Sequence, residues 1–107
     1  MFHFLNFLVM KLQVHSVHFN ADQKLIDFVQ KKVDKLETFY DRLVGGEVFL
    51  RLNNEGIENK TVEIKLNVPG DQLFAKEQAS SFEEAAGLAT DALRNQLKKF
   101  KAKITSN

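Results

Sequence analysis

The chain contains no cysteine, which excludes a disulfide framework, thiolate chemistry and a zinc site with sulfur ligands. This fits a reducing compartment. Tryptophan is also absent and there is one tyrosine, whereas ten phenylalanines supply the material of a hydrophobic core. The formal net charge is only +1, so binding to a polyanion would require positive charge concentrated on one part of the surface. The 107 residues are enough for one domain around a single core.

The apolar N-terminal segment, residues 1–9 (MFHFLNFLV), is too short to cross a membrane, because a spanning helix needs about 20 apolar residues. It also lacks the basic start and the cleavage site of a signal peptide. Regular alternation starts after Met10. We therefore expect an N-terminal extension at 1–9, one domain at 10–104 and a tail at 105–107. The extension either precedes a natural start at Met10 or packs on the domain or on a partner.

A long helix is predicted from Asp22 to Leu43. Its apolar residues recur at steps of three and four, as on a helix packed against a core: Ile26, Val29, Val33, Leu36, Tyr40 and Leu43. At about 100° per residue, four basic residues fall on one line away from that stripe: Lys24, Lys31, Lys35 and Arg42. Aspartates form a third line beside them. The pattern fits either an ordinary solvated face with mixed charges or a ridge of cations for a polyanion.

Asn20 or Asp22 is expected to cap this helix, and Gly45-Gly46 to end it. Alternating apolar and polar residues predict strands at 11–19, 47–53, 61–68 and about 72–79. Pro69-Gly70 has the residues of a type II turn between the last two strands. Glu77 falls on the apolar side of the last strand, so we expect that strand to leave the sheet there.

The last predicted helix opens with a capping box, Ser81 to Glu84. Its apolar stripe has one member every three or four residues: Phe82, Ala86, Ala89, Leu93, Leu97, Phe100 and Ile104. Its second half carries five basic residues: Arg94, Lys98, Lys99, Lys101 and Lys103. Cations at a helix C-terminus interact favourably with the helix dipole. Five of them, with no acid after Asp91, exceed what that interaction requires.

The predicted order is β-α-β-β-β-α, an α+β fold with a mostly antiparallel four-stranded sheet. One-sided strands and amphipathic helices place both helices on one face of that sheet. The first helix is a crossover, which makes the first two strands parallel if they are neighbours. The two helices then lie side by side, and their basic stripes line one cleft or ridge. This geometry favours the polyanion interpretation.

The stretch from Lys11 to Ile104 resembles the short ribosome hibernation-promoting factors, relatives of ribosome-associated inhibitor A. The resemblance rests on FVQKKVDKLETFYDRL at 28–43, VFLRL at 48–52 and NQLKKFKAKI at 95–104. It implies a fold similar to double-stranded RNA-binding domains. It also implies docking on the small ribosomal subunit, in the channel for mRNA and tRNA, which silences idle ribosomes in starvation or stationary phase. By position it implies rRNA contacts for six residues: Lys32, Lys35, Arg42, Arg51, Lys99 and Lys101.

The candidate rRNA-binding set combines the basic stripes with these positions: Lys24, Lys31, Lys32, Lys35, Arg42, Arg51, Arg94, Lys98, Lys99, Lys101 and Lys103. Such cations replace counterions on rRNA phosphates without reading sequence, and the shape of the channel would supply specificity. The expected partners are the small ribosomal subunit with its rRNA and the 70S ribosome. We expect a cytoplasmic protein that is monomeric off the ribosome and has no membrane contact.

Enzymatic chemistry is not expected, because the sequence offers no nucleophile–base pair and no glycine loop that cradles phosphate. No cofactor is expected. His15 and His18 would point to opposite faces of a strand, which argues against a metal site. Two alternatives remain open. One is a general RNA-binding module that stacks bases on Phe49 and Phe74 of the open sheet face. The other is a protein-interaction domain that uses residues 1–9.

Overall fold

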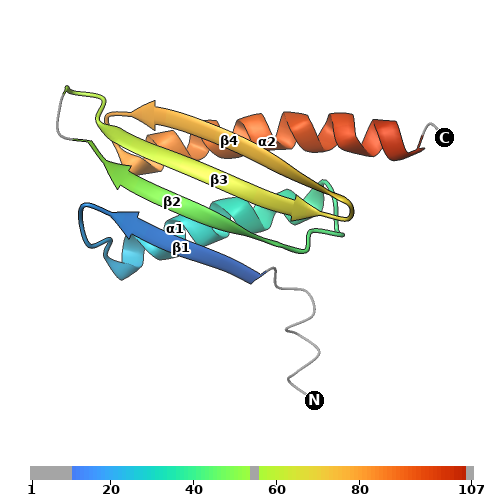
Figure 1. Ribbon diagram of the computed structural model, residues 1–107, viewed down its shortest axis with the longest axis horizontal. Coiled ribbons are helices and arrows are strands. Elements are labelled where there is room, and N and C mark those ends of the chain that lie inside the picture. Colours follow the sequence, from blue (N-terminus) through green and yellow to red (C-terminus); the bar gives the residue numbers. More distant parts are fainter. Residues whose placement is uncertain (1–10, 54–55, 106–107) are drawn as a thin grey trace, which may run out of the picture.

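The computed structural model describes residues 11–53 and 56–105. Within them the elements follow in this order: β1 (Lys11–Val17), α1 (Gln23–Asp34), the short 3₁₀ helix η2 (Lys35–Thr38), β2 (Gly45–Leu52), β3 (Lys60–Val68), β4 (Asp71–Ala79) and α2 (Phe82–Thr105). The sheet has the order β1-β2-β3-β4, with β1 parallel to β2 and the other neighbours antiparallel. Both helices lie on one face of the sheet and leave the other open (Figure 1). The predicted α+β fold is confirmed.

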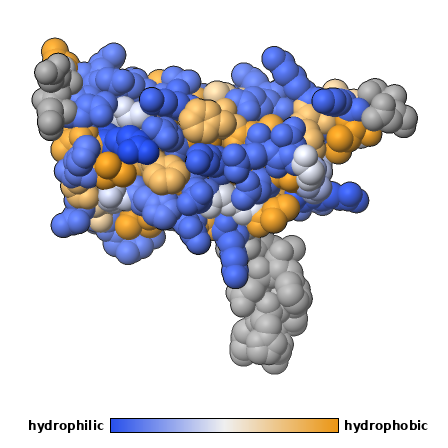
Figure 2. Space-filling view, in the orientation of Figure 1, coloured by the Kyte–Doolittle hydropathy of each residue, from blue (hydrophilic) through white to orange (hydrophobic). Residues whose placement is uncertain are grey.

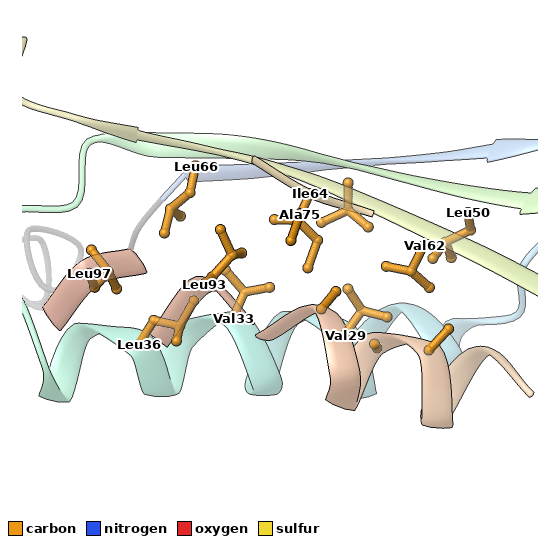
Figure 3. Packing of buried hydrophobic residues seen from close by; sticks show 14 of the residues in the cluster. Val29, Val33, Leu36, Leu50, Val62, Ile64, Leu66, Ala75, Leu93 and Leu97 are labelled. Atoms are coloured by element: carbon orange, nitrogen blue, oxygen red, sulfur yellow. The ribbon is translucent and has the colours of Figure 1, made fainter. Parts of the chain in front are cut away.

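The core lies between the sheet and the two helices. The alternating residues of β3 are buried on the helix side, and Val62, Ile64 and Leu66 have no exposed surface. Leu93 and Leu97 of α2 are equally buried. Figure 3 shows the buried residues of both helices pointing toward those of the strands. Because these apolar faces are turned to the sheet, the polar faces of both helices are turned outward.

The first helix is shorter than predicted. Asp22 caps it, since its Oδ1 accepts a hydrogen bond of 2.9 Å from the backbone N–H of Leu25. The α-helix ends at Asp34 and tightens into η2, and the chain then turns toward β2. A helix continuing to Leu43 would leave no residues to reverse the chain before β2. Leu43 is nevertheless buried as its spacing predicted.

Gly45 and Gly46 do not end a helix, contrary to the prediction; they are the first residues of β2. A side chain at Gly45 would place its Cβ 2.8 Å from the carbonyl oxygen of Lys11. At Gly46 the Cβ would lie 2.5 Å from the carbonyl oxygen of Lys65. Real Cβ atoms do not approach so closely, so β2 can lie between its neighbours here only with glycine.

The other boundaries differ from expectation in three places. β1 ends at Val17, because His18 turns the chain with a positive φ of 71°. β4 does not leave the sheet at Glu77, which pairs with Val62 while the ladder continues to the end of the strand. Ile104 is 44% exposed and outside the core, because the end of α2 extends past the sheet (Figure 1).

The predicted turn before β4 and the predicted cap after it are both present. Gly70 has a φ of 78°, the value that the third residue of a type II turn requires. At the start of α2, the backbone N–H of Glu84 donates to Oγ of Ser81 over 3.1 Å. This confirms the backbone half of the predicted capping box.

Candidate nucleic-acid interface

Lys32 of α1 lies on a different side of the helix from the aspartates. At about 100° per residue, Lys32 is on the flank that meets α2, and Asp27 and Asp34 lie more than a third of a turn away, with Lys31 between them on the outward face. Neighbouring glutamines hold these aspartates: Gln23 donates to Asp27 over 2.9 Å and Gln30 to Asp34 over 2.8 Å. In the described part of the chain, no carboxylate lies within ion-pair distance of Lys24, Lys31 or Lys35.

An open groove of about 440 Å³ lies where α1 and η2 meet α2. Its lining residues come from all three elements and from the residue after η2: Lys32, Lys35, Leu36, Thr38, Phe39, Thr90, Asp91 and Arg94. We call it the interhelical groove. It brings Lys32 and Lys35 together with Arg94, a third predicted site residue that is distant from them in sequence.

Arg94 is held at this groove by two contacts. A terminal nitrogen lies 3.4 Å from Oδ1 of Asp91 on the preceding helical turn. The guanidinium carbon lies 5.8 Å from the ring centroid of Phe39. On the other wall, Nζ of Lys32 lies 5.7 Å from the ring centroid of Phe28. These contacts orient the two cations without neutralising Lys32.

The predicted run of cations in α2 divides between two sides of the helix. Lys101 lines a second hollow beside the interhelical groove, formed by residues 38–41. Lys99 and Lys103 line a hollow on the other side, together with Leu73 of β4. Lys98 is exposed. The expected single cleft therefore receives only part of this run.

Arg42 is exposed, but it lies in the connection after η2 and not on a helix. The predicted alignment of Arg42 with Lys24, Lys31 and Lys35 is therefore wrong, because the α-helix that would have produced it ends at Asp34. All four side chains remain exposed. Whether they contact rRNA stays a prediction.

Arg51 lies on the opposite side of the molecule, on the open sheet face. Its Nε lies 2.9 Å from Oε2 of Glu63 on the neighbouring strand. It also lies over the ring of Phe49, with 5.4 Å from the guanidinium carbon to the ring centroid. Lys65 approaches the same ring, and His15 stacks on it at 4.8 Å. Figure 2 shows this face as mostly hydrophilic, with small separate hydrophobic patches.

Phe39 lines the interhelical groove but is not among the site residues that the sequence predicts. Phe39 follows η2 and is half-buried. It stands outside the apolar stripe of the predicted helix, next to Tyr40, which belongs to it. The signal in the sequence was a large aromatic residue outside the apolar stripe, because packing against the core does not require one at that position.

Other kinds of site find no support in the described residues. His15 bonds Glu47 at 3.1 Å, and no group of three or more histidine, aspartate or glutamate side chains there could hold a metal ion. None of the described helices is both long and apolar enough to span a membrane. Residues 1–9, to which the prediction of an extension applies, lie outside the described residues.

Comparison with known proteins relates the chain to ribosome factors. The ribosome hibernation promoting factor of Pseudomonas putida is 29% identical over 97 residues, which are 91% of this chain and 92% of that protein. The ribosome hibernation promotion factor of Deinococcus radiodurans is 30% identical over 95 residues. That match covers 85% of this chain but 49% of the relative, so the chain spans about half the length of that protein.

Solved structures and a family model agree with this relation. A ribosomal subunit interface protein from Coxiella burnetii shares the fold, with a TM-score of 0.78 and 20% identity over 87% of this chain and 99% of that one. The N-terminal domain of Thermus thermophilus Protein Y has a TM-score of 0.74 and 25% identity over 85% and 99%. The family model for sigma 54 modulation protein / S30EA ribosomal protein matches residues 12–105. The chain therefore belongs to the sigma 54 modulation protein / S30EA ribosomal protein family.

Proposed function

We propose that this protein is a ribosome hibernation factor. It binds the small ribosomal subunit in the channel for mRNA and tRNA and blocks translation in the cytoplasm of starved or stationary-phase cells. The names of its relatives support the general role, since they describe ribosome factors and no enzyme. The observation that carries the proposal is the convergence of Lys32, Lys35 and Arg94 on one groove of the helix side.

The proposed mechanism is electrostatic and steric. Each lysine or arginine that meets an rRNA phosphate releases counterions, and this term supplies most of the affinity. The cations at the interhelical groove form the centre of the contact, and the exposed Lys24, Lys31, Lys98 and Lys101 extend it along the two helices. Arg42 contributes from the connection after η2, whereas Arg51, Lys99 and Lys103 contact rRNA only where the channel encloses the other sides. Occupancy of the channel is sufficient for inhibition and needs no catalytic residue.

The alternative of a base-stacking sheet face is less well supported. Phe74 is 46% exposed and could stack a base. Phe49, however, is already covered by His15, Arg51 and Lys65. A base could reach its ring only by displacing at least one of them. The remaining alternative, a protein interaction through residues 1–9, concerns residues that the structure does not describe.

Competition with mRNA and tRNA on purified ribosomes tests whether the protein binds in the channel. We expect the protein to co-sediment with 30S subunits and 70S ribosomes and to be displaced when mRNA and tRNA are bound first. It should also inhibit translation of a reporter mRNA in a purified system. Unchanged co-sedimentation in the presence of mRNA and tRNA would place the binding site outside the channel.

A further inference from the structure

The interhelical groove has more structure than a phosphate-binding ridge requires. A ridge of cations that follows an RNA backbone can be convex, because phosphates lie on the outside of the nucleic acid. Here the cations surround a hollow of about 440 Å³. Pockets for small ligands measure roughly 300–1,000 Å³. The hollow is therefore large enough to receive a chemical group, and not only to face one.

Phe39 provides a flat aromatic surface in this hollow. Its position is fixed by the tight turn that precedes it: its backbone N–H donates to the carbonyl of Leu36 over 3.0 Å. The hydroxyl of Thr38 donates to the carbonyl of Lys35 over 2.7 Å. Arg94 lies against the ring. Unpaired bases in RNA are typically bound by stacking on aromatic rings and on arginine guanidinium groups.

The donors for a phosphate lie around the same hollow. Arg94 contacts Asp91 through one nitrogen, and its guanidinium has further N–H donors for a phosphate oxygen. Lys32 and Lys35 add two cations against the single carboxylate of Asp91. The hydroxyl of Thr90 donates to carbonyls of its own helix, at 2.9 Å to Ala86 and 3.1 Å to Gly87. Thr90 therefore adds no free donor to the groove.

We propose that the interhelical groove binds one unpaired nucleotide, with its phosphate between Lys32, Lys35 and Arg94 and its base stacked on Phe39. This proposal rests on the proposed function for its natural source, which is a nucleotide turned out of an rRNA helix. A free nucleoside phosphate has the same chemistry and would compete for the same place. The groove then recognises an unstacked base, which a purely electrostatic contact cannot distinguish from a paired one.

Two labelled octamers separate base binding from charge. Fluorescence anisotropy should show that a single-stranded RNA octamer binds more tightly than an abasic ribose-phosphate octamer of equal charge. Phe39→Leu should weaken binding of the RNA octamer about tenfold, the range of one base–aromatic stack, and leave the abasic octamer unchanged. Arg94→Gln should weaken binding of both octamers. Phe74→Leu, an aromatic change on the open sheet face, is the matched control and should change neither.

Equal affinities for the two octamers, or an unchanged RNA affinity in a folded Phe39→Leu variant, would overturn the proposal. ATP as a competitor shows whether the groove binds free nucleotides as well as RNA. Displacement of the RNA octamer by ATP, lost in Phe39→Leu, includes free nucleotides among the ligands, whereas no displacement restricts the groove to RNA. Co-sedimentation of the wild type with 30S subunits is scored separately. Phe39-dependent octamer binding without 30S association would refute the proposed function and retain the nucleotide site.

Discussion

The helix side and the open sheet face both carry basic residues, but they place them differently. On the sheet face, strand pairing sets cations beside acids. Arg51 and Lys76 both approach Oε2 of Glu63, at 2.9 and 3.9 Å, and His15 bonds Glu47 at 3.1 Å. Opposite charges paired across adjacent strands largely cancel in their effect on a distant ligand. A ligand bound there would have to compete with these contacts.

On the helix side, cations outnumber acids at the interhelical groove, where Lys32, Lys35 and Arg94 meet the single carboxylate of Asp91. In α1 the aspartates lie on the flank away from α2, and in α2 the acids precede Arg94, so the later turns are basic. A chain with a net charge of +1 can therefore still gather three cations around one carboxylate. The position of each charge, and not the number of charges, separates the two faces.

A buried and an exposed leucine of α2 test which face of this helix points outward. Leu97 has no exposed surface, so Leu97→Ala should lower the free energy of unfolding by about 2–5 kcal/mol. Leu88 is 44% exposed, and Leu88→Ala should change the free energy of unfolding by only about 0.5 kcal/mol. Urea unfolding measures both. Similar small losses for the two variants would mean that the apolar and basic faces of α2 have been assigned wrongly.

Two glycines test how tightly the sheet is packed compared with the helices. Gly46→Ala should destabilise the protein by about 1–3 kcal/mol, because its Cβ meets the backbone of Lys65. Gly87→Ala has nothing within 4 Å and should stabilise α2 by about 0.5–1 kcal/mol. Thermal melting of both variants measures the difference. Equal stabilities would show that β2 and β3 do not approach as closely as described.

The salt dependence of ribosome binding distinguishes the two faces. Changing Lys32, Lys35 and Arg94 to glutamine should reduce the slope of log affinity for 30S subunits against log salt by about two to three units, because each phosphate contact contributes about 0.7–0.9. Glutamines at Lys65 and Lys76 of the sheet face should leave the slope unchanged. A slope that falls equally for both variants would mean that positive charge acts without regard to its position.

The smallest effect is expected for the N-terminal segment. Deleting residues 1–9 should leave the melting temperature and ribosome binding nearly unchanged, because strand alternation begins only after Met10. Differential scanning calorimetry and co-sedimentation measure the two quantities. A large loss of stability would show that the segment belongs to the core.

The regular elements could be predicted because their patterns have one structural solution. Val62, Ile64 and Leu66 alternate strictly, and the buried side of a strand follows directly from period two. The end of α1 could not be predicted in the same way. Leu36 and Leu43 keep helical spacing and are buried, although the chain between them leaves the α-helix. Spacing alone does not distinguish a continued helix from a tightened turn.

The candidate site was predictable in composition but not in arrangement. The sequence identified the basic residues, but packing decides which of them face η2. Lys99 and Lys101 are two residues apart and line hollows on different sides of α2. Gly45 shows the same limit, because glycine both ends helices and permits close strand contacts, and only the neighbouring Lys11 carbonyl distinguishes these roles.

We propose that the helix side, and not the sheet face, binds the ribosome. Two variants with the same change in charge test it by co-sedimentation with 30S subunits: Lys32→Glu, Lys35→Glu, Arg94→Glu on the helix side, and Lys11→Glu, Lys65→Glu, Lys76→Glu on the sheet face. Circular dichroism and melting must confirm that both are folded, because lysine stems also cover apolar surface. We expect the helix-side variant to lose association and the sheet-face variant to retain it. A folded helix-side variant that co-sediments with wild-type affinity would contradict the claim.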